Sequence, residues 1–170
     1  MLILETDRLL LRKFNGHDAS FILTLVNNPT WLQYIGDRNI KSVSDALEYL
    51  ELGPMKSYLI NGFGLSMVEL KKSRTPIGMC GIIKRDGLDD PDIGFALMPE
   101  FTGMGYAQEI ASATLDHARK KLGLEKIVAI TTAENTASIK LLNKLGLYFQ
   151  RMVKLTEDAE ELMLFTENTD

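Results

Sequence analysis

The hydrophobic positions in the first third of the chain predict a strand followed by two helices. Residues 6–14 alternate between apolar and polar positions well enough for a half-buried strand. Asn15 can cap a helix that ends before Pro29, and Ser42 can cap a second helix that Pro54 stops. The apolar positions that support these elements are Leu9 and Leu11 in the strand, Phe21, Ile22, Leu25 and Val26 in the first helix, and Val43, Ala46, Leu47 and Leu50 in the second.

From residue 62 onward the pattern predicts three successive strands and then an alternation of helices and strands. The polar turn at residues 71–75 indicates a hairpin between the first two of these strands, and Gly123 and Gly146 are placed to end helices. The predicted order is β-α-α-β-β-β-α-β-α-β-β, a mixed α/β fold with no linker that would divide residues 1–170 into two domains. The predicted strands are 62–70, 76–84, 92–98, 127–132, 147–155 and 161–165, the last two as a closing hairpin, and the predicted helices are 105–122 and 135–145.

The composition excludes several classes of function. Lys and Arg total 19 and Asp and Glu total 23, so the net charge of −4 gives no basic surface for nucleic acid or an anionic membrane, although it mildly favours cationic amines as ligands. No apolar run reaches the roughly 18 residues that span a bilayer, and the N-terminal segment is too acidic for a signal peptide. We therefore expect a soluble cytoplasmic protein.

The residues that commonly bind metals or form disulfides are scarce. Cys80 is the single cysteine and lies in an apolar run, which favours a packed core thiol over a reactive one. His17 and His117 have no partners at ligand spacing, so we expect no metal site.

Residues 92–109 combine a strand, a tight turn with two glycines and the start of a helix. Free backbone N–H groups converge at a helix N-terminus, where the helix dipole adds partial positive charge. Gly103 and Gly105 lack a Cβ, so the backbone can turn sharply and approach an anion closely. The turn has neither the Lys and Ser/Thr of a Walker loop nor the third glycine of a Rossmann fingerprint. It therefore predicts either a phosphate cradle of another kind or a turn that serves backbone geometry alone.

Four ordered motifs extend over nearly the whole chain. The first strand reads Thr-x-Arg-Leu-x-Leu-Arg from Thr6, and an acidic-x-Gly-aromatic motif begins at Asp92. Pro-Glu-aromatic-x-Gly-x-Gly-Tyr-Ala begins at Pro99, and Asn-x-x-Ser-x-x-Leu-Leu-x-Lys-Leu-Gly begins at Asn135. In these motifs and their order the chain resembles the GNAT superfamily of N-acetyltransferases, within the branch of RimJ/RimL-type ribosomal-protein N-terminal acetyltransferases.

The resemblance implies both the fold and an acetyl-CoA site. It implies a central, mostly antiparallel mixed sheet that is splayed where acetyl-CoA enters, with helices on its flanks. Backbone groups of Ala96, Leu97 and Met98 would then pair with the pantetheine arm, and the N–H of Leu97 or Met98 would point at the thioester oxygen. Asn135 would hydrogen-bond the same arm. The backbone amides that would hold the pyrophosphate are those of Thr102, Gly103, Met104, Gly105, Tyr106 and Ala107.

Acetyl transfer to an alkylamine requires a base, because an amine with a pKa near 10 is protonated at neutral pH. Asp92 is the first candidate; it stands where the family usually has Glu, and its shorter side chain favours action through a water, although a solvated turn residue is the alternative interpretation. Glu69 is the second candidate, and Ser138 is a candidate for protonating or hydrogen-bonding the thiolate. The chain departs from the broad family pattern at Glu100, where Gln or Arg is usual, and at Leu142, where many members have a tyrosine acid that the Rim-type branch commonly lacks.

The sequence thus predicts an acetyl-CoA-dependent N-acetyltransferase that passes the acetyl group directly to a primary amine. The acceptor is either a protein N-terminus or a small-molecule amine, and the protein is a monomer or a homodimer. The alternative function is a non-catalytic acyl-CoA-binding or sensor domain of the same fold, which has kept the cradle and lost the acid and base groups.

Overall fold

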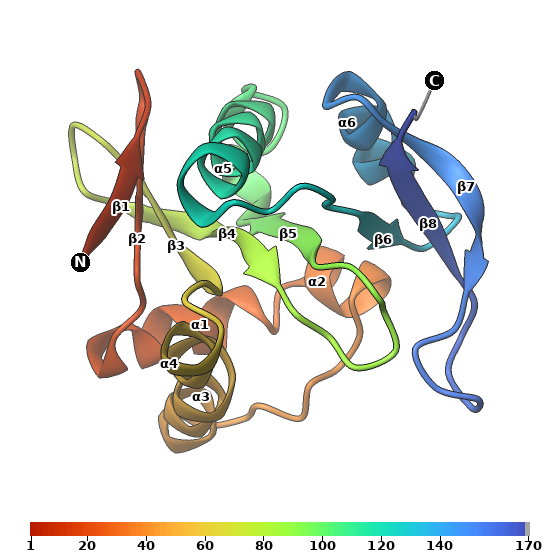
Figure 1. The fold of residues 1–170 in the computed structure, drawn as a ribbon. Coiled ribbons are helices and arrows are strands. Elements are labelled where there is room, and N and C mark those ends of the chain that lie inside the picture. Colours follow the sequence, from red (N-terminus) through yellow and green to blue (C-terminus); the bar gives the residue numbers. More distant parts are fainter. Residues whose placement is uncertain (169–170) are drawn as a thin grey trace.

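The computed structural model describes residues 1–168, which fold into two antiparallel sheets with helices on both sides (Figure 1). The strands are β1 (Leu2–Glu5), β2 (Leu9–Arg12), β3 (Leu65–Leu70), β4 (Pro76–Ile83), β5 (Asp92–Leu97), β6 (Ala129–Thr131), β7 (Leu147–Val153) and β8 (Leu162–Glu167). The α-helices are α1 (Ala19–Leu25), α2 (Pro29–Tyr34), α3 (Val43–Leu50), α4 (Lys56–Ile60), α5 (Tyr106–Leu122) and α6 (Thr136–Lys144), and the shorter helical turns are η1 (Gly16–Asp18), η2 (Glu51–Met55) and η3 (Pro99–Phe101).

The two sheets touch at one point and then diverge. The first has the strand order β1-β2-β3-β4-β5, and the second has the order β6-β8-β7. A parallel bridge joins Asp92 to Val128, where the Ile93 N–H donates to the Val128 carbonyl at 2.9 Å and the Val128 N–H donates to the Pro91 carbonyl at 3.0 Å. Within residues 1–168 no further bridge joins β5 to β6. The sheet is therefore splayed between these strands, and the predicted splayed, mostly antiparallel α/β fold is confirmed.

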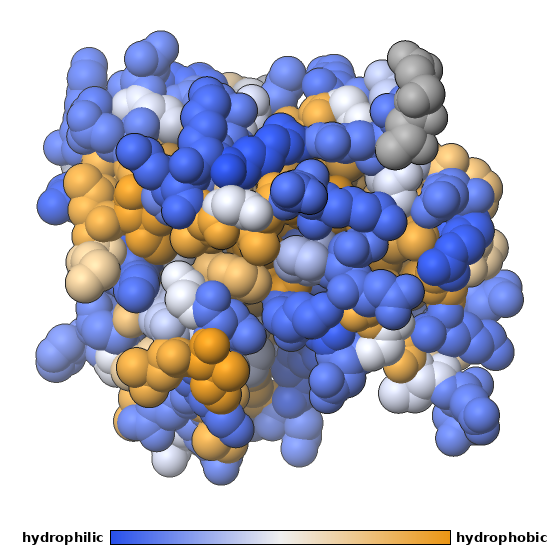
Figure 2. All heavy atoms as spheres, in the orientation of Figure 1, coloured by the Kyte–Doolittle hydropathy of each residue, from blue (hydrophilic) through white to orange (hydrophobic). Residues whose placement is uncertain are grey.

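Helices cover the larger sheet on both faces, and each face has its own core. Helix α5 packs on β4 and β5 over a cluster that includes Ile77, Cys80 and Ile110. Helices α1 and α3 pack on the opposite face, over a second cluster that includes Met67 and Met79 (Figure 1). Figure 2 shows polar side chains over most of the visible surface, with apolar side chains exposed near β1 and α4.

The N-terminal region differs from its predicted elements in three ways. The strand predicted at residues 6–14 is the shorter β2, and β1, which was not predicted, pairs with it across a turn at residues 6–8. Helix α2 was not predicted, because Pro29 was interpreted only as a helix terminator; it is the first residue of α2, a position that suits proline, and Asn28 caps the Trp31 N–H. Pro54 does not stop the helical path, because the chain widens into the π-helical turn η2 around it and continues as α4.

Candidate active site

The free edge of β5 faces the opening between the two sheets. The Ile93 N–H points toward β6, whereas the Met98 N–H donates to the Ile77 carbonyl on β4 at 2.8 Å. Backbone groups alternate in direction along a strand, so the N–H and C=O groups of Phe95 and Leu97 also point into the opening. Of the two predicted donors to a thioester oxygen, Leu97 therefore has the available N–H. An extended ligand with amide groups can pair along this edge as an additional strand.

The glycine turn that follows β5 leads directly into α5. Gly103 and Gly105 have φ angles of +75° and +81°, the left-handed region that favours glycine. The 17-residue helix begins at Tyr106, and its first N–H groups have no acceptors within the helix. Thr102 uses both its N–H and its hydroxyl to donate to the Pro99 carbonyl, at 3.2 and 2.8 Å, so the predicted pyrophosphate donors that remain are those from Gly103 onward.

The turn between β1 and β2 braces this cradle through Glu109. The carboxylate of Glu109 accepts from the Thr6 hydroxyl at 2.6 Å, the Arg8 N–H at 3.0 Å and the Arg8 Nε at 2.7 Å. Burial alone would raise the pKa of Glu109, but these hydrogen bonds outweigh it and the pKa is lowered. The Arg8 Nη1 also donates to the Met104 carbonyl at 3.0 Å. Thr6 and Arg8, noted in the sequence as part of a motif, thus hold the glycine turn against the N-terminal strands.

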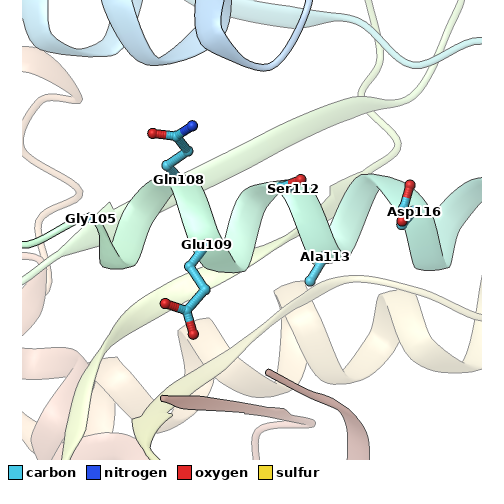
Figure 3. Close-up of a pocket in the computed structure, with 6 residues that line it drawn as sticks. All are labelled: Gly105, Gln108, Glu109, Ser112, Ala113 and Asp116. Carbon is cyan, nitrogen blue, oxygen red and sulfur yellow. The ribbon is translucent and has the colours of Figure 1, made fainter. Parts of the chain in front are cut away.

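A surface groove of about 510 Å³ runs along α5 from the cradle. Figure 3 shows its residues on the helix, with Gln108 and Glu109 pointing in opposite directions from the first turn. The groove is distinct from the opening between β5 and β6. Its lining residues are Gly105, Gln108, Glu109, Ser112, Ala113 and Asp116.

Helix α6 follows β6, the strand on the other side of the opening. The Asn135 Oδ1 accepts from the Ser138 N–H at 3.2 Å and caps the helix, which leaves the Nδ2 of Asn135 without an acceptor in residues 1–168. Ser138 is half-buried on the first turn of α6. Thr132, just beyond β6, has a buried Oγ1 with no hydrogen-bond partner, and the sequence analysis did not identify it. Its only sequence signal is its place at the end of a strand, three residues before the helix cap.

Asp92, the first candidate base, lies at the closed end of the opening, where the two sheets meet. It is 1% exposed, and its Oδ1 accepts from the Arg85 Nε at 2.8 Å. Burial raises the pKa of Asp92, and the charge and hydrogen bond of Arg85 oppose this rise. Asp92 shares the face of β5 with Gly94 and Ala96, because side chains alternate along a strand. That face is the one covered by α1 and α3.

Glu69, the second candidate, is bound in a different group of charges. Its Oε1 accepts from the Arg12 Nε at 2.7 Å, and its Oε2 lies 3.6 Å from the Arg74 Nη1. Arg12 also donates to both carboxylate oxygens of Asp18, each at 2.9 Å. Strand β4 separates Glu69 from β5, a lateral distance of about 10 Å for two strand spacings. The structure therefore does not bring Asp92 and Glu69 together.

The cysteine and the possible metal ligands considered in the sequence are not placed for catalysis or metal binding in residues 1–168. Cys80 is fully buried next to the Thr114 hydroxyl, and burial raises the pKa of its thiol to about 12. Across residues 1–168, no cluster of three His, Cys, Asp or Glu side chains is placed to bind a metal ion. In the same part of the chain, no helix has the length and hydrophobicity needed to cross a membrane.

The cradle can be tested with two glycines that have the same backbone conformation. Gly103→Ala and Gly123→Ala each place a Cβ at a left-handed φ, +75° and +67°, with no atom within 4 Å, so each costs about 1–2 kcal/mol of stability. Only Gly103→Ala crowds the approach to the amides, and we expect it to weaken CoA binding about tenfold or more. Calorimetric titration with CoA measures this, and equal affinities for the two variants would contradict the assigned cradle.

This geometry defines a class of protein: an α/β fold whose splayed sheet leaves one edge of β5 free, beside a glycine turn that leads into α5. A model of the acetyltransferase (GNAT) domain matches residues 8–148, and the chain belongs to this family. Acetyl-CoA is the cosubstrate of GNAT acetyltransferases. The activity is therefore acetyl-CoA-dependent N-acetyl transfer to an amine.

The relatives agree with this assignment. YoaA of Bacillus subtilis (strain 168), an uncharacterized N-acetyltransferase, is 30% identical over 146 residues, which cover 85% of this chain and 81% of that protein. The ribosomal-protein-S5-alanine acetyltransferase from Vibrio fischeri superposes with a TM-score of 0.79 at 19% identity, covering 98% of this chain and 96% of that one. RimL, a ribosomal L7/L12 α-N-protein acetyltransferase solved with coenzyme A, superposes with a TM-score of 0.80 at 16% identity, covering 98% and 97%. At such identities the two structures show a shared fold alone.

Proposed function

We propose that this N-acetyltransferase transfers acetyl directly to a primary amine bound on the α1/α3 face of the splayed sheet. The observation that carries the proposal is the opening between β5 and β6 beside the glycine turn. When bound, acetyl-CoA supplies an activated acetyl thioester. The acceptor is a protein N-terminus or a small-molecule amine, in a cytoplasmic monomer or homodimer that folds as one domain over residues 1–170.

Backbone and side-chain hydrogen-bond donors that could bind acetyl-CoA lie along the opening. The backbone groups of Phe95 and Leu97 on the edge of β5 would pair with the pantetheine arm, since those of Ala96 and Met98 face β4, and the Leu97 N–H would donate to the thioester oxygen. The Asn135 Nδ2 would donate to the same arm. The amides from Gly103 to Ala107 would hold the pyrophosphate, supported by the brace through Arg8 and Glu109.

Asp92 is our proposed base, acting through water. Its raised pKa makes the carboxylate a stronger proton acceptor than an exposed aspartate. Its burial at the closed end of the opening, five strand residues from Leu97, prevents direct contact with an amine there, so a chain of waters must carry the proton. Ser138 is the candidate hydrogen-bond donor to the departing thiolate. Glu69 is already paired with two arginines, and its position supports a role in stability.

Asp92→Asn tests the base while keeping nearly the same shape. We expect kcat to fall about 10²-fold or more, within the range for general-base catalysis, while the Kd for CoA stays within about threefold. Activity requires the carboxylate form, so the wild-type rate rises with pH through the raised pKa of Asp92, and the variant loses this limb. Unchanged turnover would remove Asp92 from the mechanism.

One experiment distinguishes an N-acetyltransferase from a non-catalytic acyl-CoA sensor. Thiol release from acetyl-CoA is measured with a panel of amines and N-terminal peptides, beside calorimetric titration of CoA. Turnover with any acceptor supports the proposal, whereas tight CoA binding with no turnover across the panel favours a sensor.

A further inference from the structure

The guanidinium group of Arg8 lies against the glycine turn that precedes α5. Its Nε donates to the Glu109 carboxylate at 2.7 Å, and its Nη1 donates to the Met104 carbonyl at 3.0 Å. Its Nη2 donates to no group in residues 1–168. A Cβ built on Gly105 would lie 3.3 Å from this nitrogen, so Nη2 lies within about 5 Å of the Gly105 Cα, one bond length further away. One donor of Arg8 is therefore unused beside the second glycine of the turn.

Contacts of both its side chain and its backbone hold Arg8 in a fixed position. The Cζ of the guanidinium lies 4.4 Å from the centroid of the Tyr106 ring, on the first residue of α5. The Arg8 N–H donates to Glu109 at 3.0 Å, and the Arg8 carbonyl accepts from the Lys71 N–H at 2.8 Å. The side chain is 48% exposed, so a ligand can reach the unused Nη2. A guanidinium that is already fixed loses little conformational freedom on forming one more hydrogen bond, which favours binding.

The glycine turn itself supplies no positively charged side chain. Residues 99–107 contain a single charged residue, Glu100, and a carboxylate cannot donate a hydrogen bond to a phosphate. Glu109 adds a second negative charge in the first turn of α5. The helix dipole contributes only about half a positive charge at the start of the helix. Without Arg8, a phosphate that approached the amides of the turn would therefore meet two carboxylates and no cation from either segment.

We propose that the Nη2 of Arg8 donates to a pyrophosphate oxygen of CoA, beside the backbone amides of the glycine turn. This inference rests on the proposed function, which places the pyrophosphate at that turn, and it adds a side chain from the β1–β2 turn to the binding site. A pyrophosphate has oxygens on two phosphorus atoms, so some can accept from the amides while another accepts from Nη2. A hydrogen bond from a guanidinium to a phosphate is charge-assisted, and it is stronger than one from a neutral amide.

Two variants that break the same ion pair distinguish phosphate binding from bracing of the turn. Arg8→Gln removes the guanidinium and should raise the Kd for CoA about tenfold or more. Glu109→Gln keeps an oxygen that can accept from Arg8 and removes a negative charge next to the turn, so the Kd should not rise. Calorimetric titration of each folded variant with CoA measures both values. If Arg8 only braced the turn, both variants would weaken CoA binding equally, and that result would overturn the proposal.

Dephospho-CoA identifies the phosphate group that Arg8 contacts, because it lacks the 3′-phosphate of CoA and keeps the pyrophosphate. Arg8→Gln should weaken the binding of dephospho-CoA by the same factor as the binding of CoA. A loss confined to CoA would place Arg8 at the 3′-phosphate and overturn the assignment to the pyrophosphate. Arg8→Lys keeps the positive charge and should bind CoA more tightly than Arg8→Gln does. Equal affinities for these two variants would contradict a contact between charges.

The matched control is Arg151→Gln, which removes an exposed positive charge from the edge strand β7 and should leave the Kd for CoA unchanged. An equal loss of affinity in Arg151→Gln and Arg8→Gln would indicate a general effect of net charge and overturn the contact. Calorimetry needs no amine acceptor, so the result does not depend on turnover. If the wild type bound CoA and Arg8→Gln bound it equally well, only this inference would fail. If the wild type bound no CoA, the proposed function would fail with it.

Discussion

Leu97→Pro is expected to lower kcat about 10²- to 10³-fold, the effect of losing one preorganised donor to a developing negative charge. The Leu97 N–H faces the opening rather than β4, so proline removes it without breaking a hydrogen bond of the sheet. Ala96, which would precede the proline, is already in a strand, the conformation that such a residue prefers. Single-turnover acetyl transfer, followed by thiol release, measures the loss.

The control for this variant is Leu97→Ala. It removes the same side chain from the core beneath α5 and keeps the N–H, so it separates packing from hydrogen bonding. We expect Leu97→Ala to lose stability but to retain most of its kcat. Equal kcat values for the two folded variants would show that the Leu97 N–H does not contact the reacting thioester.

Arg12→Met is expected to lower the free energy of unfolding by about 3–5 kcal/mol, the usual cost of leaving buried charges without their partner. The methionine keeps much of the length of the side chain but leaves the buried carboxylates of Asp18 and Glu69 without their shared partner. In the wild type, burial alone would raise the pKa of Asp18, but the hydrogen bonds from Arg12 and the Asn15 N–H outweigh it and lower the pKa. Urea denaturation at neutral pH gives the free energy of unfolding.

Lys41→Met provides the comparison for this loss. Lys41 forms an exposed ion pair with Asp37, so its removal should change the free energy of unfolding far less than the loss of Arg12 does. If Arg12→Met lost no more than Lys41→Met, the three-residue network would not stabilise the protein. A full loss would show that the contacts of Arg12 with Asp18 and Glu69 stabilise the junction of β2, β3 and η1.

Local sequence signals were sufficient for most elements and for the glycine turn at the start of α5. Ser42 acts as the helix cap that was predicted, and α5 begins just beyond the two glycines, as predicted. These features depend on residues within one or two turns of each other, so their physical causes are present in a short stretch of sequence. Pro54 was misinterpreted because a proline can be accommodated by a wider helical turn, such as η2 between α3 and α4.

The sequence by itself determined the order of the elements from β3 to β8, the family motifs and the placement of a glycine turn at the start of a helix. Only the tertiary structure decided that β8 lies between β6 and β7, and that one bridge at Asp92 holds the two sheets together before they diverge. It also paired Arg85 with Asp92, and Arg12 with Glu69 57 residues away. Such contacts depend on which strands become neighbours in the folded chain, and that pairing is decided by the burial of both sheet faces against helices rather than by local preference.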